Sequence, residues 1–281
     1  MKKLLFSFAL LLWVAGLLPA QPGSEYIVTN VPELLDAIGP QRTITLQPGN
    51  YDLSAHSGQQ GEYYSFTGAY DGVELEIRGV SNLLIRGAGD REAHLIARPR
   101  YGNVIRFRGC QDITVQNIKA GHGPEKGYCT GGVLLFEGCQ GIRVDDCHLY
   151  GSGTEGLTLM RSQGIAVTQT LIQGCTYSIV SMAQCQGATF DRCAFFDNEQ
   201  FDLVNISQCG PVVFRKCTFG RNQNSSNSLF FSVNQSEFPV VKKCTFRKNQ
   251  TGFLAQKEGM LVLKGNRYED NSWDENSMYR E

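Results

Sequence analysis

Short runs of alternating apolar and polar residues fill most of this chain from residue 43 onward. In "VIRFRGCQD" from Val104, "LTLMRSQG" from Leu157 and "VNISQCGP" from Val204, the alternation is that of a strand with one buried face. A Gly- or Gln-rich corner follows each run, and the runs show no helical periodicity. The pattern therefore predicts many short β-strands joined by tight corners.

These strands belong to a unit that repeats along the chain. In aligned segments, the position three residues after a shared apolar residue carries Cys147, Thr170, Cys193, Cys217, Cys244 and Asn266 in turn. The intervals between these positions are 23, 23, 24, 27 and 22 residues. A fixed period of this length without helical pattern indicates a solenoid. With three strands in each unit, parallel stacking predicts an all-β, single-stranded right-handed parallel β-helix, in which each coil buries its inner face against its neighbours.

Equivalent positions of successive coils then form columns. We expect the Cys column to point inward, and with it the residues two positions further on: Leu149, Phe195, Phe219, Phe246 and Tyr268. A column of Asn residues follows at the next turn, where Asn accepts positive φ and can hydrogen-bond along the stack. Its members are Asn198, Asn222, Asn249 and Asn271.

Ten Cys residues raise three alternatives: a metal site, disulfides or buried thiols. Zinc needs four convergent ligands, whereas a column spaces its thiols about 4.8 Å apart on one line. Parallel Cβ vectors also disfavour disulfides between coils, so we expect free, buried thiols. The same expectation holds for a second column at the corner: Cys110, Cys139, Cys185 and Cys209. Cys129 and Cys175 fall in variable loops and are the candidates for a disulfide or a reactive thiol.

The ends of the chain predict the remaining organisation. Residues 1–20 have a basic start, an apolar run and a small-residue end, which is the layout of a signal peptide cut near Ala20. Residues 21–42 contain "TNVPELLDAI", an N-capped amphipathic helix that can cover the open end of the solenoid. The β-helix is expected over 43–271, followed by a polar tail at 272–281. Residues 54–72 break the strand pattern and are left as a lid or an insertion.

Charge and hydropathy then limit the partners. The 26 basic and 27 acidic residues argue against a nucleic-acid partner recruited by bulk charge. After residue 20, no stretch approaches the roughly 20 apolar residues of a membrane span. We expect an exported bacterial protein, secreted or periplasmic, and a monomer, because the helix caps the end at which copies could stack.

The capping helix, the "TITLQPGNY" strand and the coils ending in "CTF" and Asn together resemble the right-handed parallel β-helix proteins of the pectate-lyase-like superfamily. The resemblance covers residues 43–271. It implies a protein that acts on or binds polysaccharide, with a groove along the first strand of each coil. No complete catalytic motif of these enzymes is present, so the resemblance implies the fold more specifically than an activity.

Candidate site residues follow from the register of the first strand. Arg106, Arg108 and Glu137 flank inward-facing Phe107 and Phe136, and one coil earlier Glu76 and Arg78 take the same places. They form either a solvated face with Arg–Glu pairs or a sugar-binding groove. The loop 119–132 beside it offers His122 as a candidate catalytic residue, with Lys126 and Tyr128 as candidate substrate-binding residues.

Two further carboxylates, Glu155 and Asp202, share a column two coils apart, with Ser178 between them. Their backbone spacing of roughly 10 Å suits an inverting pair, whose carboxyl groups lie about 6.5–9.5 Å apart. Glu137 is an alternative partner for Glu155. Tyr177 and Phe201 stack at the edge of the groove, as a platform for a sugar ring or as packing under a loop.

Two classes of function remain. One is a polysaccharide-binding protein that also cleaves its ligand, as a hydrolase or lyase. The other is a non-catalytic surface or envelope scaffold of adhesin-like type. The sequence implies no cofactor. Ca²⁺ would serve a lyase, but no acidic trio supports a calcium site.

Overall fold

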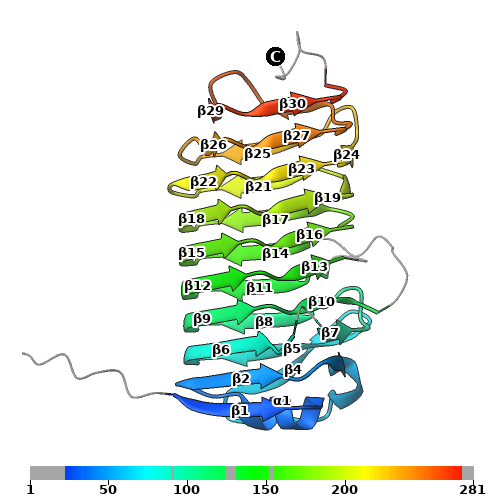
Figure 1. The fold of residues 1–281 in the computed structure, drawn as a ribbon, viewed down its shortest axis with the longest axis vertical. Helices are drawn as coiled ribbons and strands as arrows, with labels where there is room; N and C mark the ends of the chain where they lie inside the picture. Colours follow the sequence, from blue (N-terminus) through cyan, green and yellow to red (C-terminus); the bar gives the residue numbers. More distant parts are fainter. Residues whose placement is uncertain (1–22, 90–91, 124–130, 152–154, 274–281) are drawn as a thin grey trace, which may run out of the picture.

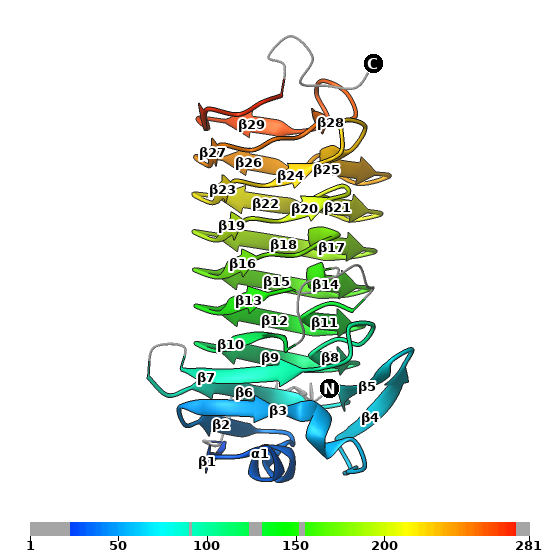
Figure 2. The same cartoon turned by 90° about the vertical axis from the view of Figure 1, so that its right-hand side faces the viewer.

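The computed structural model describes residues 23–89, 92–123, 131–151 and 155–273, which form one solenoid of stacked coils (Figure 1). Each regular coil contributes one strand to each of three long sheets, in the chain order sheet C, sheet A, sheet B. Figure 2 shows that corresponding strands lie one above another along the long axis. This architecture confirms the predicted single-stranded parallel β-helix.

Sheet A has ten strands, and nearly all its interior positions carry apolar residues. Its strands are β1 (Ser24–Val28), β2 (Arg42–Leu46), β6 (Ser81–Gly87), β9 (Gln111–Gln116), β12 (Gln140–Asp145), β15 (Gln163–Thr168), β18 (Gln186–Asp191), β22 (Val212–Arg215), β26 (Val240–Lys242) and β29 (Val262–Lys264). All neighbours in this sheet pair in parallel.

Sheets B and C have nine strands each. Sheet B contains β3 (Gly49–Asp52), β7 (Ala93–Ala97), β10 (Lys119–His122), β13 (His148–Tyr150), β16 (Leu171–Gln173), β19 (Ala194–Phe196), β23 (Thr218–Gly220), β27 (Thr245–Arg247) and β30 (Arg267–Glu269). Sheet C contains β4 (Tyr64–Ala69), β5 (Gly72–Arg78), β8 (Ile105–Arg108), β11 (Leu134–Glu137), β14 (Glu155–Met160), β17 (Ser178–Ala183), β21 (Val204–Ser207), β25 (Leu229–Asn234) and β28 (Phe253–Ala255). A short pair, β20 (Glu199–Gln200) and β24 (Gln223–Asn224), joins two of the loops.

The corners of the coils depend on single residues in the left-handed region. Lys216 (φ 54°), Arg192 (φ 53°) and Asp146 (φ 50°) each precede a Cys of the inward column. The left-handed residue sends its own side chain outward, and the next residue turns into the core. The Asn column obeys the same rule: the positive φ belongs to the residue before each Asn, such as Asp197 before Asn198. The prediction that the Asn residues themselves adopt positive φ is therefore wrong.

The Asn column forms the predicted hydrogen-bond ladder. The Asn222 amide nitrogen donates to the Phe195 carbonyl at 3.0 Å and to Asn249 Oδ1 at 3.0 Å. Its own Oδ1 accepts from the Asn198 backbone N–H. Asn198, Asn222 and Asn249 have no exposed surface, so the ladder satisfies polar groups that water cannot reach.

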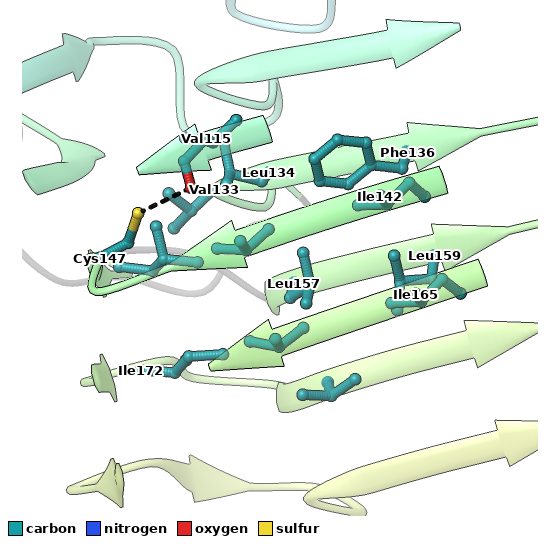
Figure 3. Close-up of a cluster of buried hydrophobic side chains, with 14 of the residues drawn as sticks. Val115, Val133, Leu134, Phe136, Ile142, Cys147, Leu157, Leu159, Ile165 and Ile172 are labelled. Carbon is teal, nitrogen blue, oxygen red and sulfur yellow. Dashed lines mark hydrogen bonds between the residues drawn. The ribbon is translucent and has the colours of Figure 1, made fainter. Parts of the chain in front are cut away.

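Both Cys columns consist of free, buried thiols, as predicted. In Figure 3, Cys147 Sγ points into the apolar core and donates to the Val115 carbonyl at 3.5 Å. Cys175 lies in the loop between β16 and β17 and outside both columns, as predicted, but it is fully buried and heads the Asn ladder. Its backbone N–H donates to Asn198 Oδ1 at 3.0 Å. Cys129 lies outside the described residues.

Phenylalanine rings stack at the spacing of the coils. Phe190 and Phe214 have ring centroids 4.6 Å apart, and Phe219 and Phe246 have theirs 4.8 Å apart. Tyr268 continues this stack on Phe246 at 5.4 Å, but 42% of its surface is exposed, unlike the fully buried positions before it. It belongs to the last coil, which has no further strand above it in sheet B.

Helix α1 (Val31–Ala37) covers the N-terminal end of the solenoid, as predicted (Figure 1). The Asn30 side chain accepts from the Glu33 N–H at 2.9 Å, and the Glu33 carboxylate accepts from the Thr29 N–H, so the two side chains cap the helix. Leu34 and Leu35 are buried against the first coils. Strand β1 precedes this helix, so sheet A begins at Ser24 rather than at residue 43.

Residues 54–72 form no separate lid. A 3-10 turn, η1 (Leu53–His56), leads to β4, which pairs with β5 in antiparallel fashion and ends sheet C. Tyr64 is buried, whereas Tyr70 is 89% exposed at the tip of this hairpin. At the other end, Trp273 of the expected polar tail is buried against Phe230 and Phe246.

Residues 1–20, the expected signal peptide, lie outside the described part of the chain. Within that part, no helix has the length and apolar character that crossing a membrane requires.

Candidate functional site

The outer face of sheet C carries the charged residues that the register of its strands predicted. Strand pairing places Glu76 beside Arg106, and Arg78 beside Arg108. The next strand places Leu135 beside Arg106 and Glu137 beside Arg108. Phe107 and Phe136 between them point inward and are fully buried. The alternation therefore brings Arg106, Arg108 and Glu137 together on one outward face.

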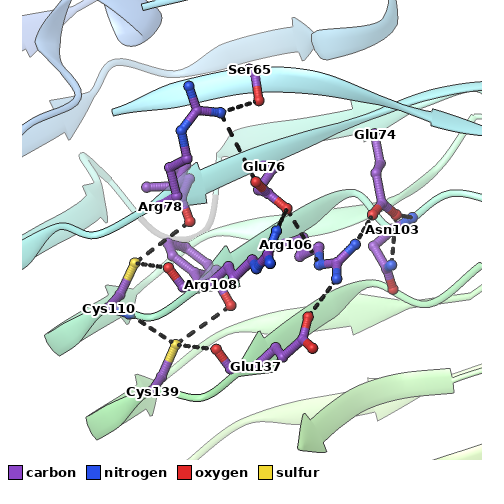
Figure 4. Close-up of polar contacts among 12 residues, drawn as sticks. Ser65, Glu74, Glu76, Arg78, Asn103, Arg106, Arg108, Cys110, Glu137 and Cys139 are labelled. Atoms are coloured by element: carbon purple, nitrogen blue, oxygen red, sulfur yellow. Dashed lines mark hydrogen bonds and ion pairs between the residues drawn. The ribbon is translucent and has the colours of Figure 1, made fainter. Parts of the chain in front are cut away.

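Arg106 lies at the centre of an ion-pair network (Figure 4). Its guanidinium pairs with Glu137 and lies 3.3 Å from Glu74 and 3.6 Å from Glu76. Glu137 also pairs with Arg161, which stands at the corner after β14. Glu76 in turn has Arg78 and Arg108 at 4.0 and 3.9 Å. Each guanidinium is thus held by a carboxylate that is itself held in place.

The network presents cations to solvent and keeps its anions beneath them. The side chains of Arg78, Arg108 and Arg161 are 43%, 61% and 52% exposed. Those of Glu76 and Glu137 are only 5% and 17% exposed. We call Arg78, Arg106, Arg108 and Arg161, with Glu74, Glu76 and Glu137 below them, the arginine face. It has four positive groups over three negative ones.

The two glutamates of the candidate catalytic set are opposite in electrostatic character. Arg106 hydrogen-bonds to Glu137 and holds the pKa of that carboxyl below its ordinary value, with Arg161 and Arg108 adding to the effect. Burial raises the pKa of Glu155 above its ordinary value, and hydrogen bonds from Thr158 and Ser181 only partly oppose this. Glu137 is therefore a fixed anion, whereas Glu155 keeps its proton to higher pH.

Glu155 and Glu137 do not come together. Leu134 pairs with Leu157, so Glu155 lies beside Gly132, and Glu137 lies five residues further along its strand. At about 3.3 Å per residue, roughly 16 Å separates the two positions along the sheet. The register thus rules out Glu137 as the close partner of Glu155.

The column of Glu155, Ser178 and Asp202 forms as expected at the start of the sheet C strands. Glu155 pairs in register with Ser178, and the Asn205 amide joins Ser178 Oγ at 2.9 Å to the Asp202 carbonyl at 3.1 Å. The Asp202 carboxylate accepts the Leu229 N–H at 2.8 Å. Asp202 therefore has one oxygen committed to the backbone of the next coil.

Gly132 is buried beside Glu155 and is closely packed by its neighbours. A side chain at residue 132 would stand 2.9 Å from Asn103 Oδ1 and 3.4 Å from Thr158 Oγ1. That hydroxyl donates to Glu155. The Asn103 amide is fixed by Glu74 at 2.7 Å, and its oxygen accepts the Gly132 N–H. The Asn103 amide and the Thr158 hydroxyl thus occupy the space that a side chain at residue 132 would need.

Tyr177 and Phe201 stack as expected, with ring centroids 4.2 Å apart and planes inclined by 28°. Phe201 is 46% exposed, so this pair offers an aromatic surface next to Asp202 at the start of the strands. The pairing of Val180 with Val204 sets Tyr177 level with Phe201 in the next coil, which is why the two rings are in contact.

His122 is not on the exposed face. It ends β10 in sheet B, is 2% exposed, and shares a 2.9 Å hydrogen bond between its Nε2 and the Gly102 carbonyl. Burial lowers its pKa, so the ring is neutral near pH 7. It supports the segment before β8 from within, and among the described residues its buried Nδ1 has no hydrogen-bond partner. Lys126 and Tyr128 lie outside the described residues.

Three members of the site were missed by sequence reasoning. Glu74 occupies a position where later coils carry inward-turning apolar residues such as Val104 and Val133, so alternation gave no signal for it. Arg161 sits on a left-handed corner, which interrupts the alternation. Asn103 lies in the loop before β8. Only the Glu74-x-Glu76 pair within an apolar strand hinted at a buried acidic cluster.

The carboxylates of the arginine face are engaged by arginine rather than grouped around an empty centre. Among the described residues, no set of three or more His, Cys, Asp and Glu side chains could hold a metal ion.

Comparison with known proteins identifies the family to which this chain belongs. Residues 71–201 and 131–278 match the family model described as a right-handed β-helix region, and the chain belongs to this family. The predicted right-handed β-helix is thereby confirmed, including its handedness. A comparison with curated proteins gave no match.

Solved structures of the same fold include two lyases and a methylesterase. An alginate lyase from Paenibacillus sp. has 11% identity and a TM-score of 0.57, covering 87% of this chain and 95% of that one. A pectate lyase from Bacillus sp. in complex with trigalacturonate has 11% identity and a TM-score of 0.53, covering 88% and 82%. A pectin methylesterase from Aspergillus niger has 11% identity and a TM-score of 0.52, covering 94% and 90%. Identities this low show a shared fold alone.

Proposed function

We propose that this protein binds an anionic polysaccharide along the outer face of sheet C. The arginine face carries the proposal, because three exposed guanidiniums lie above carboxylates that have little exposed surface. A guanidinium offers a planar pair of donors that matches a carboxylate, the group that distinguishes a uronate from a neutral sugar. The flanking carboxylates hold the guanidiniums in place, so little side-chain freedom is lost on binding.

Two further observations support the proposal. Phe201, stacked on Tyr177, provides the exposed aromatic surface on which sugar rings pack. In addition, proteins of the same fold are named for alginate, for pectin and for a complex with trigalacturonate. We therefore place a polyuronate ahead of a neutral polymer as the ligand.

A second candidate function is cleavage of the same polymer at Glu155. Its half-buried carboxyl has a raised pKa and accepts a hydrogen bond from the Thr158 hydroxyl, so it can hold a proton for a leaving-group oxygen. Asp202, two coils away at roughly 10 Å, would be the second carboxylate of an inverting hydrolase. Binding without cleavage, as in a surface scaffold, is the alternative that the arginine face alone supports.

The test is binding to a panel of immobilised polysaccharides, with product analysis. We expect retention by polygalacturonate or alginate, no retention by a neutral polymer, and weaker retention at high salt. An Arg78→Gln, Arg108→Gln double variant should lose retention, whereas Lys264→Gln, an exposed cation on sheet A, should keep it. Retention by no acidic polymer would remove the proposal. New reducing ends that disappear in Glu155→Gln would establish cleavage as well.

We also propose that the chain is exported, with residues 1–20 removed as a signal peptide. N-terminal sequencing of protein recovered from the periplasm or medium should begin near Gln21. Mature protein that still begins at Met1 and stays inside the cell would contradict this.

A further inference from the structure

A second ring-and-cation cluster lies on sheet B, away from the arginine face. Phe196 ends β19 and points outward beside Gly220 of the next coil. A Cβ at residue 220 would stand 2.4 Å from Phe196 Cε1. The ring therefore occupies space that any other residue at 220 would fill, and it lies against the sheet rather than standing out from it.

Two guanidiniums contact this ring. Arg221 has its guanidinium carbon 4.9 Å from the ring centroid, and Arg247 has its own at 5.2 Å. Both nitrogens of the Arg221 fork bind Asp197 at 2.7 Å, so this cation is neutralised and fixed. Within the described part of the chain, Arg247 has no carboxylate partner, although strand pairing puts Glu269 beside it. Among the described residues, no carboxylate therefore neutralises the positive charge of Arg247.

Arg247 borders a shallow hollow of about 490 Å³. This volume suits a sugar residue with room for its neighbours. Leu171 and Ala194 line it with apolar surface, and Gln173 adds an amide. Strand pairing sets Leu171 beside Ala194, and Gln173 beside Phe196, so these groups form one continuous patch of the sheet.

We infer that this hollow, the Phe196 site, is a second saccharide-binding site and takes an acidic sugar residue, a uronate. Arg247 pairs with the sugar carboxylate, and the apolar floor with the Phe196 ring receives the C–H face of the pyranose. Gln173 supplies hydrogen bonds to hydroxyl groups. Arg221, held by Asp197, keeps the ring in place. The inference goes beyond the proposed function, because the site shares no residue with sheet C and would let one molecule hold two chain segments.

The experiment is titration calorimetry with trigalacturonate in a background that has lost two of the four arginines of the arginine face, the Arg78→Gln, Arg108→Gln double variant. Adding Arg247→Gln or Phe196→Ala should weaken the remaining binding by about tenfold or more. Lys248→Gln is the matched control, because it removes one cation from the adjacent exposed residue, which does not line the hollow. It should change the affinity less than about twofold. A neutral trisaccharide should not bind.

A variant without a change of charge separates the ring from the cations. Gly220→Ala displaces the Phe196 ring and leaves Arg221 and Arg247 in the sequence, so it should also weaken binding. Thermal unfolding checks that each variant is folded.

Three outcomes would overturn the inference. They are no saturable binding in the background variant, an equal loss in Lys248→Gln, or unchanged affinity in both Arg247→Gln and Phe196→Ala. Binding by the wild type that vanishes in the background variant would support the proposed function and reject the Phe196 site. Binding that survives in the background variant and falls with Arg247→Gln would support this site by itself.

Discussion

Single residues at the corners carry a conformational cost in this fold. Lys216 and Lys243 adopt φ of 54° and 53°, a region that costs most L-residues about 1–2 kcal/mol. The chain accepts this cost because the following residue, Cys217 or Cys244, must turn into the core. The side chains of Lys216 and Lys243 are exposed and do not contribute to the stacked core.

Lys216→Gly is expected to stabilise the protein slightly, by about 0.5 kcal/mol, because glycine relieves the backbone strain but loses more entropy on folding. Lys216→Val should destabilise by about 2 kcal/mol, since a β-branched residue fits this region worst. Urea unfolding of both variants measures the difference. Lys242→Gly, within strand β26, is the control and should destabilise. A Lys216→Val variant as stable as the wild type would contradict the role of the corner.

The two site glutamates should respond to pH in opposite ways. Because the fold raises the pKa of Glu155, ionising it above its ordinary pKa opposes folding, so Glu155→Gln should gain stability over the wild type as the pH rises from 4 to 7. Because the fold lowers the pKa of Glu137, its anion stabilises the native state. Glu137→Gln should therefore be destabilising near pH 7 and less so as the pH falls through the folded pKa. Unfolding curves that extend well below pH 4 and up to pH 7 give both signs, and parallel pH profiles for the two variants would reject the assignment.

At the scale of elements, the ladders convert short, weak strands into a continuous structure. Strands of three residues, such as β19, β23 and β27, could not be stable alone. They are flanked at one corner by the Cys column and at the other by the Asn ladder, so each coil takes its register from its neighbours.

Asn222→Ala should lower the free energy of unfolding by about 2–4 kcal/mol, because it leaves the Phe195 carbonyl and the Asn198 N–H without partners in a dry core. Asn271→Ala, at the half-exposed end of the same ladder, should cost distinctly less, since water can replace the lost partner. Denaturant unfolding compares the two. Equal losses would show that burial does not set the strength of the ladder.

At the scale of the whole molecule, the thiol columns test the register of the entire solenoid. All nine described cysteines are buried, and the eight of the two columns are free thiols, so the folded protein should react slowly with a thiol reagent. In denaturant without reductant, at least these eight should react at once. Mass spectrometry after alkylation would locate any exception, and oxidation of the Cys193, Cys217, Cys244 column would contradict the structure.

The N-terminal cap should keep the molecule monomeric. Leu35→Asp places a charge in the interface between α1 and the first coils, exposing strand edges that can pair with another copy. We expect association or aggregation by light scattering, whereas Asp36→Ala on the exposed side of the helix should remain monomeric. A wild-type oligomer, or a monomeric Leu35→Asp variant that is folded, would contradict this role.

The spacing of like residues was enough to predict how the coils stack and which residues face outward. Phe107 and Phe136 alternate with Arg106 and Glu137 along their strands. Because side chains of a strand alternate between its two faces, burying the Phe rings places Arg106 and Glu137 on the outer face. The same reasoning failed where the backbone leaves the strand. Arg161 and the residues before each Asn are at corners, and Glu74 is held under Arg106 by an ion pair that no local pattern encodes.

The sequence by itself therefore determined the repeat, the three sheets, the capped end and the charged character of one face, because each depends on local alternation and on a constant period. Only the tertiary structure decided which charges meet. It brought Glu74, Glu137 and Arg161 to Arg106, kept Glu155 away from Glu137, buried His122, and laid Phe196 across Gly220 between two arginines. Those outcomes depend on contacts between coils some 25 residues apart, where side-chain length and corner geometry, rather than sequence period, set the distance.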